Sequence, residues 1–173
     1  LGGRPSAGAS LRNVISAVDE GGWDAIALVV QYPGNAPVLR DNQITGTIMV
    51  LGAEPTIEGN DITGSIWLHG VGATTEVRDN RIRQAAWPEL AGIWVVSSSP
   101  TVEGNEVTGF TGDVGISVGG LDVDPAYPAD PLIQGNTLRD NGTGIEIRDG
   151  AAVVESNEIS GSRIAILVQG EAT

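Results

Sequence analysis

Short segments in which apolar and polar residues alternate recur along most of this chain, separated by turns that contain Asn or Gly. Residues 55–64 and 100–109 are nearly identical copies of this pattern, and four looser copies accompany them. Alternation with a period of two is typical of β-strands, so each copy predicts one strand before a central asparagine and another after it. The six central asparagines, each preceded by Gly, Asp or Ser, are Asn42, Asn60, Asn80, Asn105, Asn136 and Asn157.

A second motif follows each of these copies and predicts a third strand per repeat. It consists of a small residue, then Ile, any residue, and a β-branched or aliphatic residue, again with a period of two. The six copies begin at Thr47, Ser65, Gly92, Gly115, Gly144 and Ala165.

The spacing of the repeats indicates how the strands are arranged. Successive central asparagines are 18, 20, 25, 31 and 21 residues apart. Three short strands with their turns fit one rung of a solenoid at this spacing. We therefore predict an all-β fold, a right-handed parallel β-helix of about six to seven rungs with three short strands per rung, over residues 37–170.

The N-terminal part of the chain is less regular. Residues 1–10 are rich in Gly, Ala, Ser and Pro and are expected to be a tail or linker. Residues 11–36 are either a first irregular coil or an N-terminal cap, because the apolar residues of 11–20 also fit helical spacing. In the first coil, Ala27 and Val29 are expected to point outward.

Stacked rungs place equivalent residues in columns. The positions three before and two after each central asparagine are aliphatic in all six copies, which predicts that they fill the core. The asparagines themselves are expected to stack as well. Each side-chain amide can then donate to one neighbour and accept from the other, or the asparagines serve only as turn formers.

These motifs resemble the right-handed parallel β-helix repeat family, whose superfold includes pectate lyases, polygalacturonases and mannuronan epimerases. The resemblance covers residues 37–170 and implies a fold rather than an activity. Polygalacturonase-like members carry paired carboxylates, a Gly-His-Gly motif and an Arg-Ile-Lys motif. This chain offers only Leu68-His69-Gly70 and Arg163-Ile164-Ala165, with no adjacent Asp pair, so that activity is not expected.

Composition excludes several classes of chemistry. The nine basic residues are all Arg, Cys is absent and His69 is the single histidine, which excludes Schiff-base lysines and disulfides and argues against a zinc site. The net charge of −13 argues against nucleic-acid binding. Apolar runs are too short for membrane insertion. The chain starts without Met, so we expect a mature or excised segment. The sequence leaves its localisation open, and an extracytoplasmic or secreted location is favoured.

Two insertions, 83–91 and 119–130, interrupt the repeats, and solenoids collect functional residues in such loops. The second insertion contains Asp122, Asp124 and Asp130, which supply the oxygen ligands that Ca²⁺ prefers. Their spacing matches no EF-hand, and a solvated acidic loop is the alternative. No other cofactor is expected.

Candidate catalytic groups lie on the third strand of the repeat. Glu146 and Arg148 point out of one strand, as a surface ion pair or as a catalytic acid with a positioning cation. His69 is either a surface histidine beside Trp67 or a general base. With the loop at 119–130, these residues define the enzymatic hypothesis, a lyase or epimerase that acts on an acidic polysaccharide.

In the first four rungs, the third strands are apolar on both faces: the inward residues fill the core, and the outward residues are apolar as well. Contiguous apolar surface of this kind marks interaction sites. Three covers are open: the N-terminal segment, a second protein or second copy of this chain, and a carbohydrate stacked on the tryptophans. We expect a non-catalytic binding or structural module that contacts protein through this face. The face comprises Met49, Leu51, Trp67, His69, Trp94 and Val96.

Overall fold

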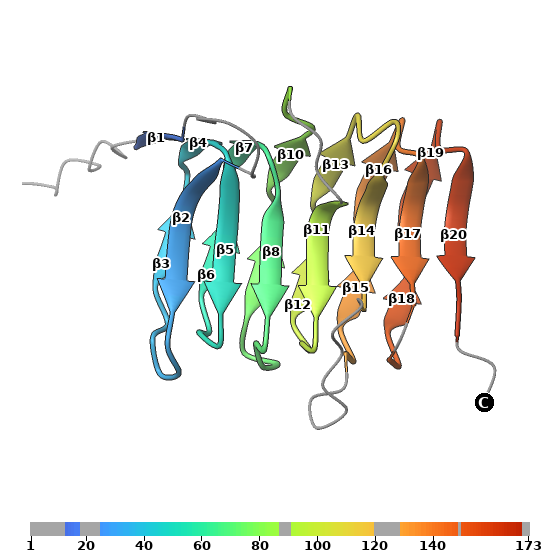
Figure 1. Cartoon of the computed structure of the whole chain (residues 1–173). Helices are drawn as coiled ribbons and strands as arrows, with labels where there is room; N and C mark the ends of the chain where they lie inside the picture. Colours follow the sequence, from blue (N-terminus) through green and yellow to red (C-terminus); the bar gives the residue numbers. More distant parts are fainter. Residues whose placement is uncertain (1–12, 18–24, 87–90, 120–128, 149, 171–173) are drawn as a thin grey trace, which may run out of the picture.

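The computed structural model describes residues 13–17, 25–86, 91–119, 129–148 and 150–170. Within these residues the chain forms twenty short strands, which stack as successive rungs of a solenoid (Figure 1). No helix that is long and apolar enough to span a membrane occurs among them. The all-β solenoid predicted from the repeats is therefore confirmed.

The strands form three parallel sheets, here named A, B and C, and a complete rung contributes one strand to each sheet; sheets A and B have seven described strands and sheet C has six. Sheet A contains, in spatial order, β1 (Val14–Ser16), β4 (Gln43–Thr45), β7 (Asp61–Thr63), β10 (Arg81–Arg83), β13 (Glu106–Thr108), β16 (Thr137–Arg139) and β19 (Glu158–Ser160). Sheet B contains β2 (Ile26–Gln31), β5 (Thr47–Leu51), β8 (Ile66–His69), β11 (Ala91–Val96), β14 (Val114–Val118), β17 (Thr143–Ile147) and β20 (Ile164–Val168). Sheet C contains β3 (Val38–Arg40), β6 (Thr56–Glu58), β9 (Glu76–Arg78), β12 (Thr101–Glu103), β15 (Leu132–Gln134) and β18 (Val153–Glu155).

The predicted columns of aliphatic residues form the core. In sheet A, for example, Ile62 lies between Ile44 and Ile82, and all three are almost fully buried. Parallel pairing in register keeps like residues in contact from rung to rung, so the core is continuous along the axis of the solenoid.

The first rung is described in part, over residues 13–17 and 25–31. Val14–Ser16 pairs in parallel with Gln43–Thr45 as strand β1. The expectation that Ala27 and Val29 point outward is wrong for Ala27. An irregularity in β2 aligns Leu28, not Ile26, with Ile48, so Val29 and Gln31 take the outward positions.

The residue before each of the six central asparagines adopts a left-handed backbone conformation, with φ between 55° and 65°. Such a conformation favours Gly and is tolerated by Asp, Asn and Ser-type residues better than by bulky ones. This explains the residue types that precede the asparagines, which are Asp41, Gly59, Asp79, Gly104, Gly135 and Ser156.

The sequence did not predict a second column of stacked residues, which lies at the corner between sheets A and B. Phe110 is fully buried five residues after Asn105, and Asn141 is buried five residues after Asn136. The Asn141 Oδ1 accepts a hydrogen bond from the Phe110 N–H at 3.1 Å, and its Nδ2 donates to the Val107 carbonyl at 3.2 Å. Phe110 therefore fills the core while Asn141 satisfies the turn that holds it.

Candidate functional site

The six asparagines form a continuous hydrogen-bonded ladder along the corner between sheets C and A. Each of the first five donates its backbone N–H and its Nδ2 to the Oδ1 of the asparagine one rung further on, at 2.9–3.0 Å, and Asn157 accepts at the end of the series. Asn13 is a seventh member, because its Nδ2 donates to the Asn42 Oδ1 at 3.0 Å. Since these groups are largely buried and satisfied, the ladder stabilises the scaffold and offers little free chemistry.

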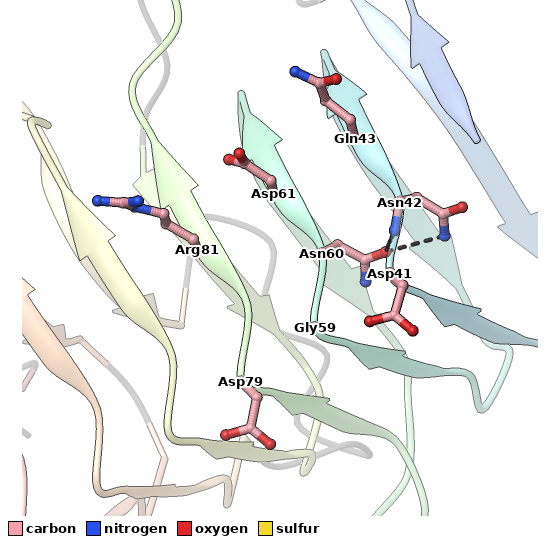
Figure 2. Close-up of a pocket in the computed structure, with 8 residues that line it drawn as sticks. All are labelled: Asp41, Asn42, Gln43, Gly59, Asn60, Asp61, Asp79 and Arg81. Atoms are coloured by element: carbon pink, nitrogen blue, oxygen red, sulfur yellow. Dashed lines mark hydrogen bonds between the residues drawn. The ribbon is translucent and has the colours of Figure 1, made fainter. Parts of the chain in front are cut away.

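A surface hollow of about 280 Å³ lies over this ladder in the early rungs (Figure 2). Asp41 and Asp79 flank it two rungs apart, and Gly59 between them leaves the space open. Asp61 and Arg81 also line it, but they form ion pairs with Arg83 and Glu106 respectively. Among the described residues, no group of three or more acidic, His or Cys side chains is placed to hold a metal ion.

The outward face of sheet B brings the predicted binding residues together. One outward row crosses the strands of sheet B, whose order Figure 1 shows, and consists of Val29, Met49, Trp67, Trp94, Ser117, Glu146 and Leu167 in the strand pairing. A second row begins with Gln31, Leu51, His69 and Val96. The first row is thus apolar from β2 to β11, polar on β14 and β17 and apolar again at Leu167, while the second row includes the polar Gln31 and His69.

The two tryptophans at the centre of this face stack on each other. Their ring centroids lie 5.4 Å apart with an interplanar angle of 17°. The Trp94 Nε1 donates to the Gly119 carbonyl at 3.0 Å, whereas the buried Trp67 Nε1 has no hydrogen-bond partner among the described residues. Because each ring covers one face of the other, the pair presents less aromatic surface than two separate rings would.

Part of the outward face is already covered within this chain. Val96, Ser117 and Glu146 occupy outward positions, yet each is at most 6% exposed. By contrast, Val29 is 42% exposed, and Met49, Leu51 and Trp67 are half-buried. Trp94 on β11 and Leu167 on β20 are half-buried as well, and the residues on β2, β5 and β8 form the contiguous group that lies before the buried Val96, Ser117 and Glu146. We call Val29, Met49, Leu51 and Trp67 the apolar patch.

Glu146 and Arg148 form the expected ion pair, with 3.1 Å between Glu146 Oε2 and Arg148 Nη2. The expectation of a surface pair is wrong for Glu146, whose side chain is only 5% exposed, while that of Arg148 is 47% exposed. The contact is an ion pair without hydrogen-bond geometry, because the buried Oε2 has no hydrogen-bond partner among the described residues.

The other candidate catalytic and metal-binding residues do not join this pair. His69 is exposed on β8, three strands away from β17, which is about 14 Å at the usual strand spacing. Asp122 and Asp124 lie outside the described residues. The Asp130 Oδ1 accepts a hydrogen bond from the Ala151 N–H at 3.1 Å.

The fold and its repeats agree with the comparison with known families. The family described as right handed beta helix region matches residues 27–173. The chain belongs to this family. No curated protein and no solved structure matches the chain. Membership fixes a right-handed β-helix and leaves activity open, since this scaffold carries both enzymes and non-catalytic domains.

Proposed function

We propose that this β-helix is a non-catalytic binding or structural module, and that it contacts protein through the apolar patch. The observation that carries the proposal is the arrangement of Val29, Met49, Leu51 and Trp67 on three adjacent strands of one parallel sheet. Apolar side chains in contiguous outward positions lose contact with water when a second protein covers them, which favours association.

The electrostatics of the chain are consistent with a protein partner. The sequence carries a net charge of −13, but the apolar patch itself contains no charged residue. An interface core of this kind, apolar and aromatic with charge kept outside it, is typical of protein–protein contacts. The patch is small, so a single such contact is expected to be weak.

Carbohydrate binding is less well supported by the same residues. Sugars bind to open aromatic ring faces, and here Trp67 and Trp94 cover one face of each other. The aliphatic neighbours Met49 and Leu51 offer no hydrogen-bonding groups for sugar hydroxyls. The protein-contact proposal therefore explains the composition of the patch better.

Light scattering of the wild type and of Met49→Arg tests the proposal. If two copies meet through this face, the wild type forms a closed dimer of about 36 kDa, twice the chain mass of 17.8 kDa, and Met49→Arg is monomeric. Thr56→Arg, on the outward face of β6 in the same rung as β8, is the matched control and should behave as the wild type. Unchanged mass and unchanged stability in Met49→Arg would count against an interface at this face.

A second candidate function rests on the buried position of Glu146. The Glu146 side chain is at an outward position of the strand, yet it is buried and paired with Arg148. This arrangement resembles a catalytic acid with a positioning cation more than an ordinary surface ion pair. We infer that, if the module acts on an acidic polysaccharide, Glu146 and Arg148 form its catalytic site. Ultraviolet absorbance of unsaturated products from a panel of uronans, with and without Ca²⁺, would reveal lyase activity. Its loss in Arg148→Ala, with Arg139→Ala as control, would assign it to the pair.

A further inference from the structure

The sequence contains nine asparagines, and Asn141 is the one that a glycine follows. An asparagine before glycine deamidates most readily, because glycine has no side chain to hinder the attack of its backbone nitrogen on the asparagine side chain. The six central asparagines are followed instead by Gln, Asp, Arg, Glu, Thr and Glu. The sequence therefore identifies Asn141 as the chemically labile asparagine of this chain.

The structure holds both reactive groups of this dipeptide in place. Asn141 is 2% exposed, and Gly142 is buried beside it. The Phe110 N–H donates to the Asn141 Oδ1 at 3.1 Å, and the Gly142 N–H donates to the Phe110 carbonyl at 2.7 Å. The backbone of Phe110 thus binds both the side-chain amide that the reaction attacks and the nitrogen that attacks it.

Further hydrogen bonds hold the dipeptide from both sides. In the rung that follows, the Arg163 N–H donates to the Asn141 carbonyl at 3.3 Å, and the Ile164 N–H donates to the Gly142 carbonyl at 3.1 Å. The Asn141 Nδ2 donates to the Val107 carbonyl at 3.2 Å. Ring closure needs the Asn141 Cγ and the Gly142 nitrogen to rotate toward each other, which these bonds oppose. The reaction therefore requires the corner between sheets A and B to open.

Neither residue of the dipeptide is easily exchanged for a stable alternative. A Cβ at position 142 would lie 2.8 Å from the Asp113 carbonyl oxygen and 3.1 Å from the Asp113 nitrogen, which is closer than real side chains come to a backbone. Position 141 needs both an acceptor for the Phe110 N–H and a donor for the Val107 carbonyl. The fold therefore retains a labile pair because these two residues fit this corner.

We propose that Asn141 is a deamidation site whose reaction is controlled by opening of the corner between sheets A and B. The Gly142 nitrogen gives up its proton and forms a bond to the Asn141 Cγ, while the Cγ–Nδ2 bond breaks and ammonia leaves with that proton. Water then opens the resulting succinimide and yields either an aspartate or a β-aspartate. No oxidant or reductant takes part. The inference does not rest on the proposed function.

Either product prevents the corner from closing as before. An aspartate at position 141 has no Nδ2 donor, so its carboxylate would face the Val107 carbonyl in a buried position without a hydrogen bond between them. A β-aspartate adds one methylene group to the backbone shortly before β17, which pairs in register with β14 and β20. Opening of this corner is thus converted into an irreversible change of the chain.

Peptide mapping by mass spectrometry, after incubation of the full chain at mildly alkaline pH, tests the inference. At a urea concentration that unfolds the chain, Asn141 should deamidate faster than any other asparagine. In native buffer at the same pH and temperature, its rate should fall at least about tenfold, because only the open fraction reacts. Equal rates in the two conditions overturn the control by the fold. Faster reaction of another asparagine in urea overturns the assignment of the site.

Phe110→Leu and Ile57→Val separate opening of this corner from a general loss of stability. Both substitutions shorten fully buried side chains, but Ile57 lies on β6 in sheet C, away from the labile dipeptide. Phe110→Leu keeps the backbone bonds of residue 110, so it should raise the native rate at Asn141 about fivefold or more through easier opening and leave the rate in urea unchanged. Ile57→Val should leave both rates near those of the wild type. Equal acceleration in the two variants overturns the assignment of the control to this corner.

Two further measurements do not depend on how well Phe110→Leu folds. In the wild type, hydrogen exchange of the Gly142 N–H and deamidation of Asn141 should rise together as urea is added below the unfolding transition; exchange that rises without deamidation overturns the inference. Asn141→Asp reproduces one product and should have a lower urea midpoint than the wild type. Asn35→Asp, at an exposed asparagine, is the matched control and should change the midpoint little. An unchanged midpoint in Asn141→Asp overturns the claim that deamidation prevents closure.

Discussion

Asn80 and Asn105 are joined by two hydrogen bonds to one acceptor, since the Asn80 backbone N–H and its Nδ2 both lie 3.0 Å from the Asn105 Oδ1. The Asn105 Nδ2 in turn lies 2.8 Å from the Val77 carbonyl and 3.1 Å from the Glu103 carbonyl. A buried side chain with this many partners leaves several groups unsatisfied when it is removed. We expect Asn105→Ala to lower the free energy of unfolding by about 3 kcal/mol or more, measured by urea denaturation.

Asn157 provides the internal control for this prediction. It is only half-buried, and it accepts from Asn136 but has no ladder acceptor beyond it among the described residues. Asn157→Ala should therefore cost about 1 kcal/mol, because water replaces part of what is lost. Equal losses at the two positions would show that the asparagines act only as turn formers, independent of their place in the ladder.

Gly104 and Gly64 both have positive φ but differ in what surrounds them. A Cβ at Gly104 (φ 65°) would approach the Asp79 Oδ1, the end of a side chain that can rotate away. A Cβ at Gly64 (φ 146°) would run into the backbone carbonyl of Gly46, which is fixed by the adjacent rung. We expect Gly104→Ala to cost about 1–2 kcal/mol from backbone strain. Gly64→Ala should lower the thermal midpoint much more, and a similar shift for both would contradict this reasoning.

The aliphatic columns and the ladder were predictable from sequence because both repeat once per rung. Ile57, Ile62 and Asn60, for example, recur at fixed offsets, and the parallel stacking of rungs turns a fixed offset into a spatial contact. Repetition of this kind carries information about register that a single strand does not contain.

Features that occur once per chain could not be predicted in the same way. The irregularity at Ala27 is hidden because residues on both sides of it are apolar, so either register buries an aliphatic side chain. Phe110 and Asn141 share an offset, but their side chains differ too much to reveal a column. The burial of Glu146 depends on what covers the outward face of sheet B, which strand periodicity does not encode.

Trp67 and Trp94 stack on each other but differ in how their indole N–H groups are satisfied. Trp94→Phe removes the donor to the Gly119 carbonyl, so it should lower the free energy of unfolding by about 1 kcal/mol. Trp67→Phe removes a buried N–H that has no partner among the described residues, so it should change stability little or raise it slightly. Both substitutions keep an aromatic ring in the stack. A larger loss for Trp67→Phe than for Trp94→Phe, in urea denaturation, would contradict this assignment.

Glu146 and Arg148 differ in burial, and this difference predicts which partner is more costly to remove. Arg148→Ala leaves a carboxylate that is 5% exposed without its cation, so we expect a loss of about 2 kcal/mol. Glu146→Gln keeps the shape of the buried side chain and releases an arginine that is 47% exposed and can be hydrated, so the loss should stay below about 1 kcal/mol. The double variant should be close to Glu146→Gln alone, because the buried charge is then absent. Urea denaturation of the three variants measures this coupling, and additive losses would show that the two side chains do not interact in solution.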